Sequence, residues 1–193
     1  YDTDSVWSRY ILREIPYTGK IRSLILKIRG NIKNLEENFL TNYCHTTTAV
    51  SEVDAEYYRT FVKDKTKIKI LSNVIDLNSY AFKNIKSKIE NKYPSIYLAG
   101  SFGHKNSPMD KAALWMIEEI MPLVWREISN VKFYIVGRNS ETFLKKSTKH
   151  KNIITTGKVE SVLPYLMYSD LSVVPLKFES GTRFKILESA ACN

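Results

Sequence analysis

Cysteine, histidine and long apolar runs are scarce in this sequence of 193 residues. The two cysteines, Cys44 and Cys192, are far apart, which excludes a disulfide framework and a Cys-x-x-Cys metal site and favours a reducing compartment. The three histidines show no metal-ligand spacing. No apolar run approaches the roughly 20 residues that span a bilayer. We therefore expect no metal, no membrane-spanning helix and a cytoplasmic location.

The positive charge of the chain is unevenly distributed. The formal net charge is +9, and the excess of Lys and Arg over Asp and Glu falls mainly after Tyr80. Such an excess favours anionic partners, either phosphorylated small molecules or acidic lipids, although a solvated lysine-rich surface explains it equally well. No block of Lys and Arg is long enough for a nucleic-acid-binding arm. The sequence also lacks a motif in which basic and aromatic residues alternate. We expect no nucleic-acid partner.

The first 80 residues mix helices with two short strands. Apolar residues recur at three- and four-residue steps from Tyr1 to about Asn42, and Pro16 with Gly19 divides this pattern into two helices. Ser51 is a candidate N-cap for a helix that ends near Val62. Strands are predicted at residues 44–50 and 67–71, and a linker at 72–92 with a short helix from residue 80 to 91.

After Pro94 strands and helices alternate regularly. This order is typical of βαβ units around a parallel sheet, so the predicted fold class is α/β and Rossmann-like. The domain boundary is predicted between residues 80 and 81. The predicted strands are 95–100, 132–136, 153–156 and 171–175, and the predicted helices are 109–128, 141–149, 162–168 and 182–192.

Small residues mark the ends of the predicted strands. Gly100 precedes Ser101 and Phe102, Gly137 ends the next strand, and Gly157 stands shortly before Val159. Ligands of open parallel sheets bind beyond the carboxyl ends of the strands, where a glycine lets a ligand approach the backbone. A turn that ends a strand is the alternative explanation for each glycine taken alone.

The segment from Glu179 to Glu188 carries the most chemistry. A loop of small residues leads into a helix, whose free N–H groups and positive dipole end suit a phosphate. Arg183 and Lys185 add cations for a diphosphate, and Glu188 is placed to accept hydrogen bonds from a ribose diol. The alternative is a capped surface helix with solvated charges. The candidate loop residues are Ser180, Gly181 and Thr182.

From Ile96 to Cys192 the chain resembles the C-terminal domain of the large retaining glycosyltransferase family of GT-B fold, called group 1 or family 4. The matching pieces include Leu98-Ala99-Gly100-Ser101-Phe102, Phe133-Tyr134-Ile135-Val136-Gly137, Ile154-Thr155-Thr156-Gly157-Lys158-Val159 and Gly181-Thr182-Arg183-Phe184-Lys185-Ile186-Leu187-Glu188. Residues 50–55 and 71–76 resemble the end of that family's N-terminal domain and its linker.

The resemblance implies transfer of a sugar from a nucleotide diphosphate sugar to a glycan or lipid-linked acceptor, with retention, without metal and without a further cofactor. It implies that Glu188 binds the donor ribose and that Arg183 and Lys185 hold the diphosphate. The family's first glutamate of the E-x7-E motif falls on Ser180, and the usual Arg and Lys after Gly100 are absent. A non-catalytic nucleotide- or glycan-binding module on the same fold is the alternative.

We also expect that the chain is truncated at both ends, because it starts without Met and stops within an apolar pattern. Residues 1–80 would then be the end of the acceptor-side domain, and residues 81–193 an incomplete nucleotide-sugar domain, inactive alone. Basic and aromatic residues of the first helices leave open a peripheral contact with an anionic membrane at its inner face, against a merely solvated amphipathic helix. They are Trp7, Arg9, Tyr10, Lys20, Arg22, Lys27 and Arg29.

Overall fold

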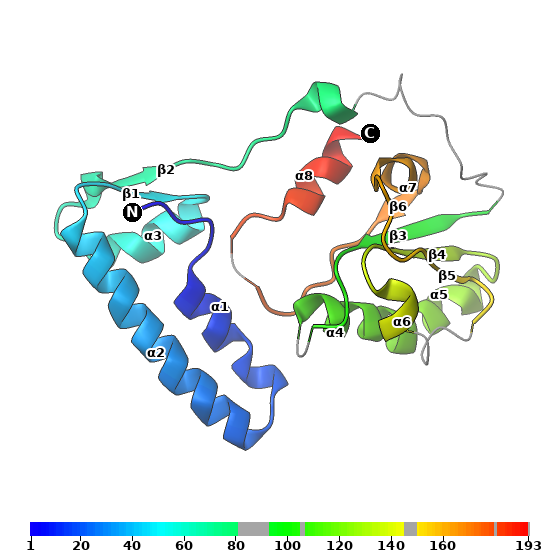
Figure 1. Cartoon of the computed structure of the whole chain (residues 1–193), viewed down its shortest axis with the longest axis horizontal. Helices are drawn as coiled ribbons and strands as arrows, with labels where there is room; N and C mark the ends of the chain where they lie inside the picture. Colours follow the sequence, from blue (N-terminus) through cyan, green and yellow to red (C-terminus); the bar gives the residue numbers. More distant parts are fainter. Residues whose placement is uncertain (81–92, 105–106, 145–149, 180, 193) are drawn as a thin grey trace. The chain divides into compact units, whose positions relative to one another are not determined.

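A computed structural model describes residues 1–80, 93–104, 107–144, 150–179 and 181–192. The chain forms two compact units (Figure 1). The first contains residues 1–74 and 178–184, and the second contains residues 75–177 and 185–193. Segment 178–184 thus belongs with the N-terminal unit, although the prediction assigned it to the C-terminal domain together with the rest of 81–193.

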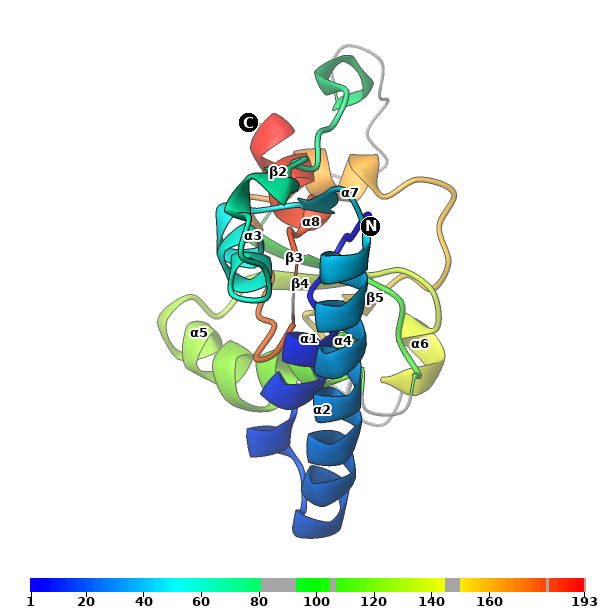
Figure 2. The same cartoon turned by 90° about the vertical axis from the view of Figure 1, so that its left-hand side faces the viewer.

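The first unit combines a helical hairpin with a short parallel sheet. Helices α1 and α2 lie side by side (Figures 1 and 2), and a 3-10 turn that contains Pro16 separates them, as the sequence predicts. Ser51 caps α3, because its Oγ accepts a hydrogen bond from the backbone N–H of Asp54 at 3.2 Å. The elements are α1 (Trp7–Arg13), α2 (Lys20–Tyr43), β1 (Thr47–Ala49), α3 (Glu52–Arg59) and β2 (Ile68–Ile70).

The carboxylate of Glu37 is fully buried where the two helices meet. It accepts hydrogen bonds from the backbone N–H of Ser8 at 3.1 Å and from its hydroxyl at 2.5 Å. The Ser8 hydroxyl also lies 2.8 Å from the hydroxyl of Tyr57 on α3. A buried carboxylate is tolerated only when it is hydrogen-bonded, so this network fixes the hairpin against α3.

The second unit is built on a four-stranded parallel sheet of order β5-β4-β3-β6. This confirms the predicted Rossmann-like α/β class. The predicted strand 171–175 forms only two residues of ladder. The predicted helix 141–149 ends at Phe143, and residues 145–149 lie outside the described residues. The linker helix at 80–91 falls almost wholly outside them. The elements are β3 (Ser95–Ala99), α4 (Pro108–Trp115), α5 (Met121–Glu127), β4 (Lys132–Val136), α6 (Ser140–Phe143), β5 (Ile153–Thr155), α7 (Leu163–Tyr168), β6 (Leu171–Ser172) and α8 (Phe184–Ala191).

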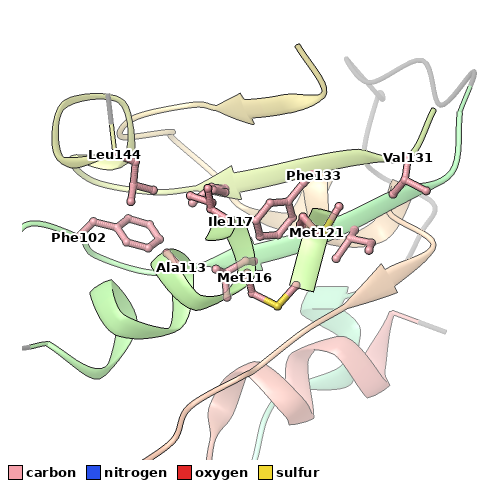
Figure 3. Packing of buried hydrophobic residues seen from close by; sticks show 11 residues of the cluster. Phe102, Ala113, Met116, Ile117, Met121, Val131, Phe133 and Leu144 are labelled. Carbon is pink, nitrogen blue, oxygen red and sulfur yellow. The ribbon is translucent and has the colours of Figure 1, made fainter. Parts of the chain in front are cut away.

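Both faces of this sheet are covered, as the continuous burial of β3 requires. Ile96 and Leu98 point to the face covered by α4 and α5, where Phe133 and Ile135 complete the main core (Figure 3). The intervening side chains point to the other face, toward α7. That second cluster contains Tyr97, Ala99, Val136 and Leu166.

The helix predicted at 109–128 is continuous but not uniform. A π-helical segment, Met116–Ile120, joins α4 to α5. Pro122 follows it, in the first turn of α5. Proline lacks a backbone N–H and its ring clashes with the carbonyl four residues earlier, so the widened π turn accommodates it within the helix. Met116, Ile117 and Met121 still reach the core (Figure 3).

Candidate functional site

The order of the strands in the second unit defines where a ligand is expected. From β3 the chain adds β4 and then β5 on one side, and β6 returns to the opposite side of β3. Strands β3 and β6 therefore flank a topological switch point. In open α/β sheets ligands bind beyond the carboxyl ends of the strands at such a point.

The exit of β3 is a tightly held loop. The Gly100 N–H donates to the carbonyl of Val136 at 3.0 Å, and the Phe102 N–H donates to the carbonyl of Arg138 at 3.0 Å. Ser101 between them is exposed. The side chain of Phe102 is fully buried in the main core (Figure 3), and its carbonyl accepts a hydrogen bond from Nδ2 of Asn139 at 3.1 Å.

Asp110 on α4 holds the next turn of this loop. Its Oδ1 accepts the Gly103 N–H at 3.0 Å, and the residue is buried. Burial raises the pKa of the Asp110 carboxyl, while the hydrogen bond from Gly103 and the nearby His104 lower it. The β3 exit is thus fixed by side-chain and backbone bonds before any ligand arrives.

Gly137 ends β4 with φ of 129°. A Cβ at this position would overlap the carbonyl oxygen of Gly100. The Gly137 N–H donates to the carbonyl of Gly157 at 3.1 Å, so successive strand exits pack backbone against backbone. The glycines at 137 and 157 therefore have a structural cause of their own. Val159 packs partly buried against the second cluster, on the face of the sheet that α7 covers.

Helix α8 lies along the strands at the switch point. The Oγ of Ser189 donates to the Oγ of Ser172 on β6 at 2.8 Å. One residue earlier, Oε1 of Glu188 accepts a hydrogen bond from the hydroxyl of Tyr80 at 3.1 Å. Lys185 is half-buried in the first turn of the helix, and its ammonium group makes no ion pair with the residues that the structure describes.

Glu188 contributes to a raised pKa in three neighbouring groups. The pKa of Tyr80 is raised by burial, then by its hydrogen bond to Glu188 and by the carboxylate charge. Burial also raises the pKa of Tyr97 on β3 and of the Cys192 thiol, and in both the charge of Glu188 adds to the effect. The side chain of Glu188 thus lies near the phenolic groups of Tyr80 and Tyr97 and near the Cys192 thiol.

The predicted phosphate loop belongs to the first unit. Helix α8 begins at Phe184, two residues later than predicted, so Thr182 and Arg183 precede it. Gly181 has φ of 79°, and a Cβ there would lie 2.6 Å from Oγ of Ser5. A left-handed backbone at this point excludes Gly181 itself from the helix. Ser180 lies outside the described residues.

Arg183 is engaged within this loop. Its Nε lies 3.2 Å from Oε2 of Glu179, and its guanidinium also donates to the carbonyl of Gly181. The Thr182 hydroxyl donates to the carbonyl of Val50 at 3.4 Å. The structure thus groups Gly100, Ser101, Phe102, Gly137, Val159, Lys185 and Glu188 in the second unit, and Gly181, Thr182 and Arg183 in the first.

Comparison with known proteins identifies the family. A sequence profile described as glycosyl transferases group 1 matches residues 93–193, just over half of the chain. The chain belongs to the group 1 glycosyltransferases. No curated protein sequence matches it significantly.

Solved structures that are similar to this chain share its fold at low identity. HepE of Anabaena, solved with UDP and glucose, has a TM-score of 0.61 and 14% identity over 82% of this chain and 45% of its own. A glycosyltransferase of Rickettsia africae has a TM-score of 0.64 and 13% identity over 81% of this chain and 46% of its own. WaaG, a glycosyltransferase involved in lipopolysaccharide biosynthesis, has a TM-score of 0.57 and 14% identity over 93% of this chain and 51% of its own. The chain spans about half the length of these proteins.

These comparisons confirm the predicted resemblance and GT-B fold, and they leave the individual site residues as predictions. Sequence reasoning missed the partners of Glu188. Cys192 stands four residues after Glu188 within the helix predicted at 182–192, so its proximity was available from helical spacing. Tyr80 lies in a polar linker with no periodic pattern, and nothing in the sequence indicates its hydrogen bond. Within the described residues, no three His, Cys, Asp or Glu side chains gather as metal ligands.

Proposed function

We propose that this chain supplies the nucleotide-binding part of a retaining, metal-independent glycosyltransferase. The reaction moves a sugar from a nucleotide diphosphate sugar to an acceptor hydroxyl. The observation that carries the proposal is Glu188, a carboxylate on α8 that Tyr80 hydrogen-bonds, one residue before Ser189 bonds β6 at the switch point, in a chain of this family. Its free lone pairs suit the two hydroxyls of a ribose.

The remaining candidate residues have roles that follow from their chemistry. The exposed residue Ser101 lies at the predicted ligand edge next to Gly100 and Phe102, and Gly137 and Val159 border it. Lys185, and Arg183 with Gly181, Thr182 and Ser180 before α8, would bind the diphosphate and stabilise the negative charge of the leaving group. These cations take the part that a bound metal plays in other transferases, so no metal or cofactor is needed.

Two relatives support the choice of substrates. HepE was solved with UDP-glucose, which favours a nucleotide sugar donor here. WaaG is involved in lipopolysaccharide biosynthesis, which favours a glycan or lipid-linked acceptor. We propose a cytoplasmic site of action, peripheral at the inner face of the membrane, where such acceptors are built. No helix among the described residues is long and apolar enough to cross a bilayer.

Titration calorimetry of the complete protein with UDP, GDP and ADP tests the nucleotide role of Glu188. Glu188→Gln should weaken the best nucleotide by about 1–3 kcal/mol, the cost of an imperfectly matched buried hydrogen bond. Glu127→Gln on α5, an exposed glutamate outside the site, is the matched control and should change nothing. Equal affinities for wild type and Glu188→Gln would remove the ribose assignment.

A non-catalytic nucleotide- or glycan-binding module is the second candidate. Ser180 stands where the family's first motif glutamate is expected, and that observation favours it. The discriminating measurement is turnover by the complete protein in the presence of EDTA, with the product's anomeric configuration determined by NMR. Transfer with retention supports the enzyme. Tight nucleotide binding without transfer or donor hydrolysis supports the module.

A further inference from the structure

Helix α2 packs against the rest of the first unit through its least apolar side. The buried positions on this helix are Leu26, Gly30, Glu37 and Thr41, which share one face at about 100° per residue. A Cβ at Gly30 would lie 2.6 Å from Cγ of Leu12, so the close approach of α1 needs a glycine. The contact face is thus small and polar, with a buried carboxylate at its centre.

The opposite side of α2 is apolar and exposed. Its side chains occupy an arc of about 100°, the width of a stripe that normally faces a core. The exposed fractions run from 52% for Ile25 to 82% for Ile21. The stripe, hereafter the α2 stripe, consists of Ile21, Leu24, Ile25, Ile28, Ile32, Leu35 and Phe39.

Cations border the α2 stripe on both sides. At about 100° per residue, Lys20 and Lys27 lie on one flank, and Arg22, Arg29 and Lys33 lie on the other. No acidic residue occurs between positions 20 and 35. Arg22 bonds Glu14 at 2.8 Å and Lys33 bonds Glu36 at 2.8 Å.

Three of these cations are available to a partner. The side chains of Lys20, Lys27 and Arg29 make no ion pair with any residue that the structure describes. Both flanks of the stripe therefore present positive charge that the first unit itself does not neutralise. An occupant of the stripe must bring negative charge to both sides of an apolar surface.

We propose that the α2 stripe docks this protein on an anionic membrane surface. The helix would lie in the plane of the bilayer, with the stripe at the boundary between headgroups and acyl chains. The flanking Lys and Arg side chains would extend to lipid phosphates on both sides. A sheet of anionic headgroups supplies negative charge on both flanks at once, whereas a protein partner needs two matched acidic rows.

The proposal assigns to α2 alone the membrane contact that the sequence left open for residues of both first helices. Arg9 faces Asp54 at 3.9 Å and the carbonyl of Val53. The ring of Tyr10 lies against Phe178, so both side chains are used within the first unit. The docking surface is the α2 stripe rather than the aromatic residues of α1. This proposal stands on the geometry of α2 and does not depend on sugar transfer.

Co-sedimentation with vesicles tests the proposal on the 193-residue chain. Binding to phosphatidylcholine vesicles that contain one-third phosphatidylglycerol should exceed binding to pure phosphatidylcholine at least tenfold. Ile28→Ser with Ile32→Ser should lower the binding constant at least tenfold, because two apolar side chains leave the interface. Lys20→Gln with Lys27→Gln should lower it about 25-fold on anionic vesicles only, at about fivefold per cation.

Leu123→Ser is the matched control, since Leu123 is an equally exposed apolar side chain on α5, at 54%. It should bind vesicles as the wild type does. All substituted positions are exposed, and circular dichroism should show unchanged helix content. No binding to anionic vesicles, or equal binding by the Ile28→Ser, Ile32→Ser variant, overturns the proposal.

Two further measurements exclude other occupants of the α2 stripe. A soluble dimer in analytical ultracentrifugation that Ile28→Ser with Ile32→Ser dissociates would assign the stripe to a second copy. In the complete protein without its native cysteines, Ile28→Cys should react with a thiol reagent in solution and become protected by anionic vesicles. Protection without vesicles would mean that another segment covers the stripe, and the proposal would fail.

Discussion

The hydroxyl of Tyr80 donates a hydrogen bond to Oε1 of Glu188 from a residue 108 positions earlier in the chain. The bond occupies one lone pair of the carboxylate and leaves Oε2 for a ribose hydroxyl. Tyr80 therefore orients Glu188 within the second unit, and its contribution can be separated from that of the carboxylate itself.

Tyr80→Phe in the complete protein should weaken nucleotide binding by about 0.5–1.5 kcal/mol, the usual net value of one hydrogen bond. The loss should be smaller than for Glu188→Gln, and the double variant should lose less than the sum of the two. Calorimetric titration with the preferred nucleotide measures all three. Additive losses would show that Tyr80 does not act through Glu188.

Glu179 and Arg183 form an ion pair next to the proposed diphosphate position. Glu179→Gln removes a negative charge there and should tighten diphosphate binding about threefold at low salt. Arg183→Gln should weaken it, and 0.5 M salt should reduce both effects. The measurement is nucleotide affinity at two ionic strengths. An unchanged affinity in Arg183→Gln would remove this arginine from the site.

Gly137→Ala should destabilise the second unit by about 3 kcal/mol. Alanine is strained at φ of 129°, and its Cβ would meet the carbonyl of Gly100. Gly19→Ala is the control, because a Cβ there meets nothing within 4 Å. Thermal denaturation followed by circular dichroism compares the two. Similar melting temperatures for both variants would contradict the close approach of the strand exits.

Amide exchange should be slowest in the sheet of the second unit. Leu98 and Ile135 are fully buried, and the Val173 N–H donates to the carbonyl of Tyr97 at 2.9 Å. Helix α2 exposes its apolar side, so its first turns should exchange faster. Mass spectrometry after deuterium labelling gives both rates. Slower exchange in residues 20–33 than at Leu98 would show that the hairpin is the more stable part.

The sequence by itself determined the alternation of strands and helices after Pro94, the capped start of α3 and the division of the first helices at Pro16. These features depend on local spacing and on the backbone chemistry of Pro and Ser, which a single segment displays. The sequence also determined the family resemblance, because the strand-end glycines and the run from Gly181 to Glu188 match the family's motifs in order and spacing. The start of α8 was misplaced by two residues, because Thr182 and Arg183 bond the Val50 carbonyl and Glu179 in the first unit, and the sequence does not indicate these partners.

Tertiary structure alone decided which residues meet. Tyr80 reaches Glu188, Gly137 packs on Gly100, and Phe102 turns into the core, although none of these pairs has a local signal. Segment 178–184 follows the first unit because Phe178 is buried against Tyr17 and Arg13 bonds the Glu179 carbonyl at 2.6 Å. Helix periodicity showed that α2 has an apolar side. Its exposure depended on Gly30 and Glu37, whose contacts with α1 turn that side outward.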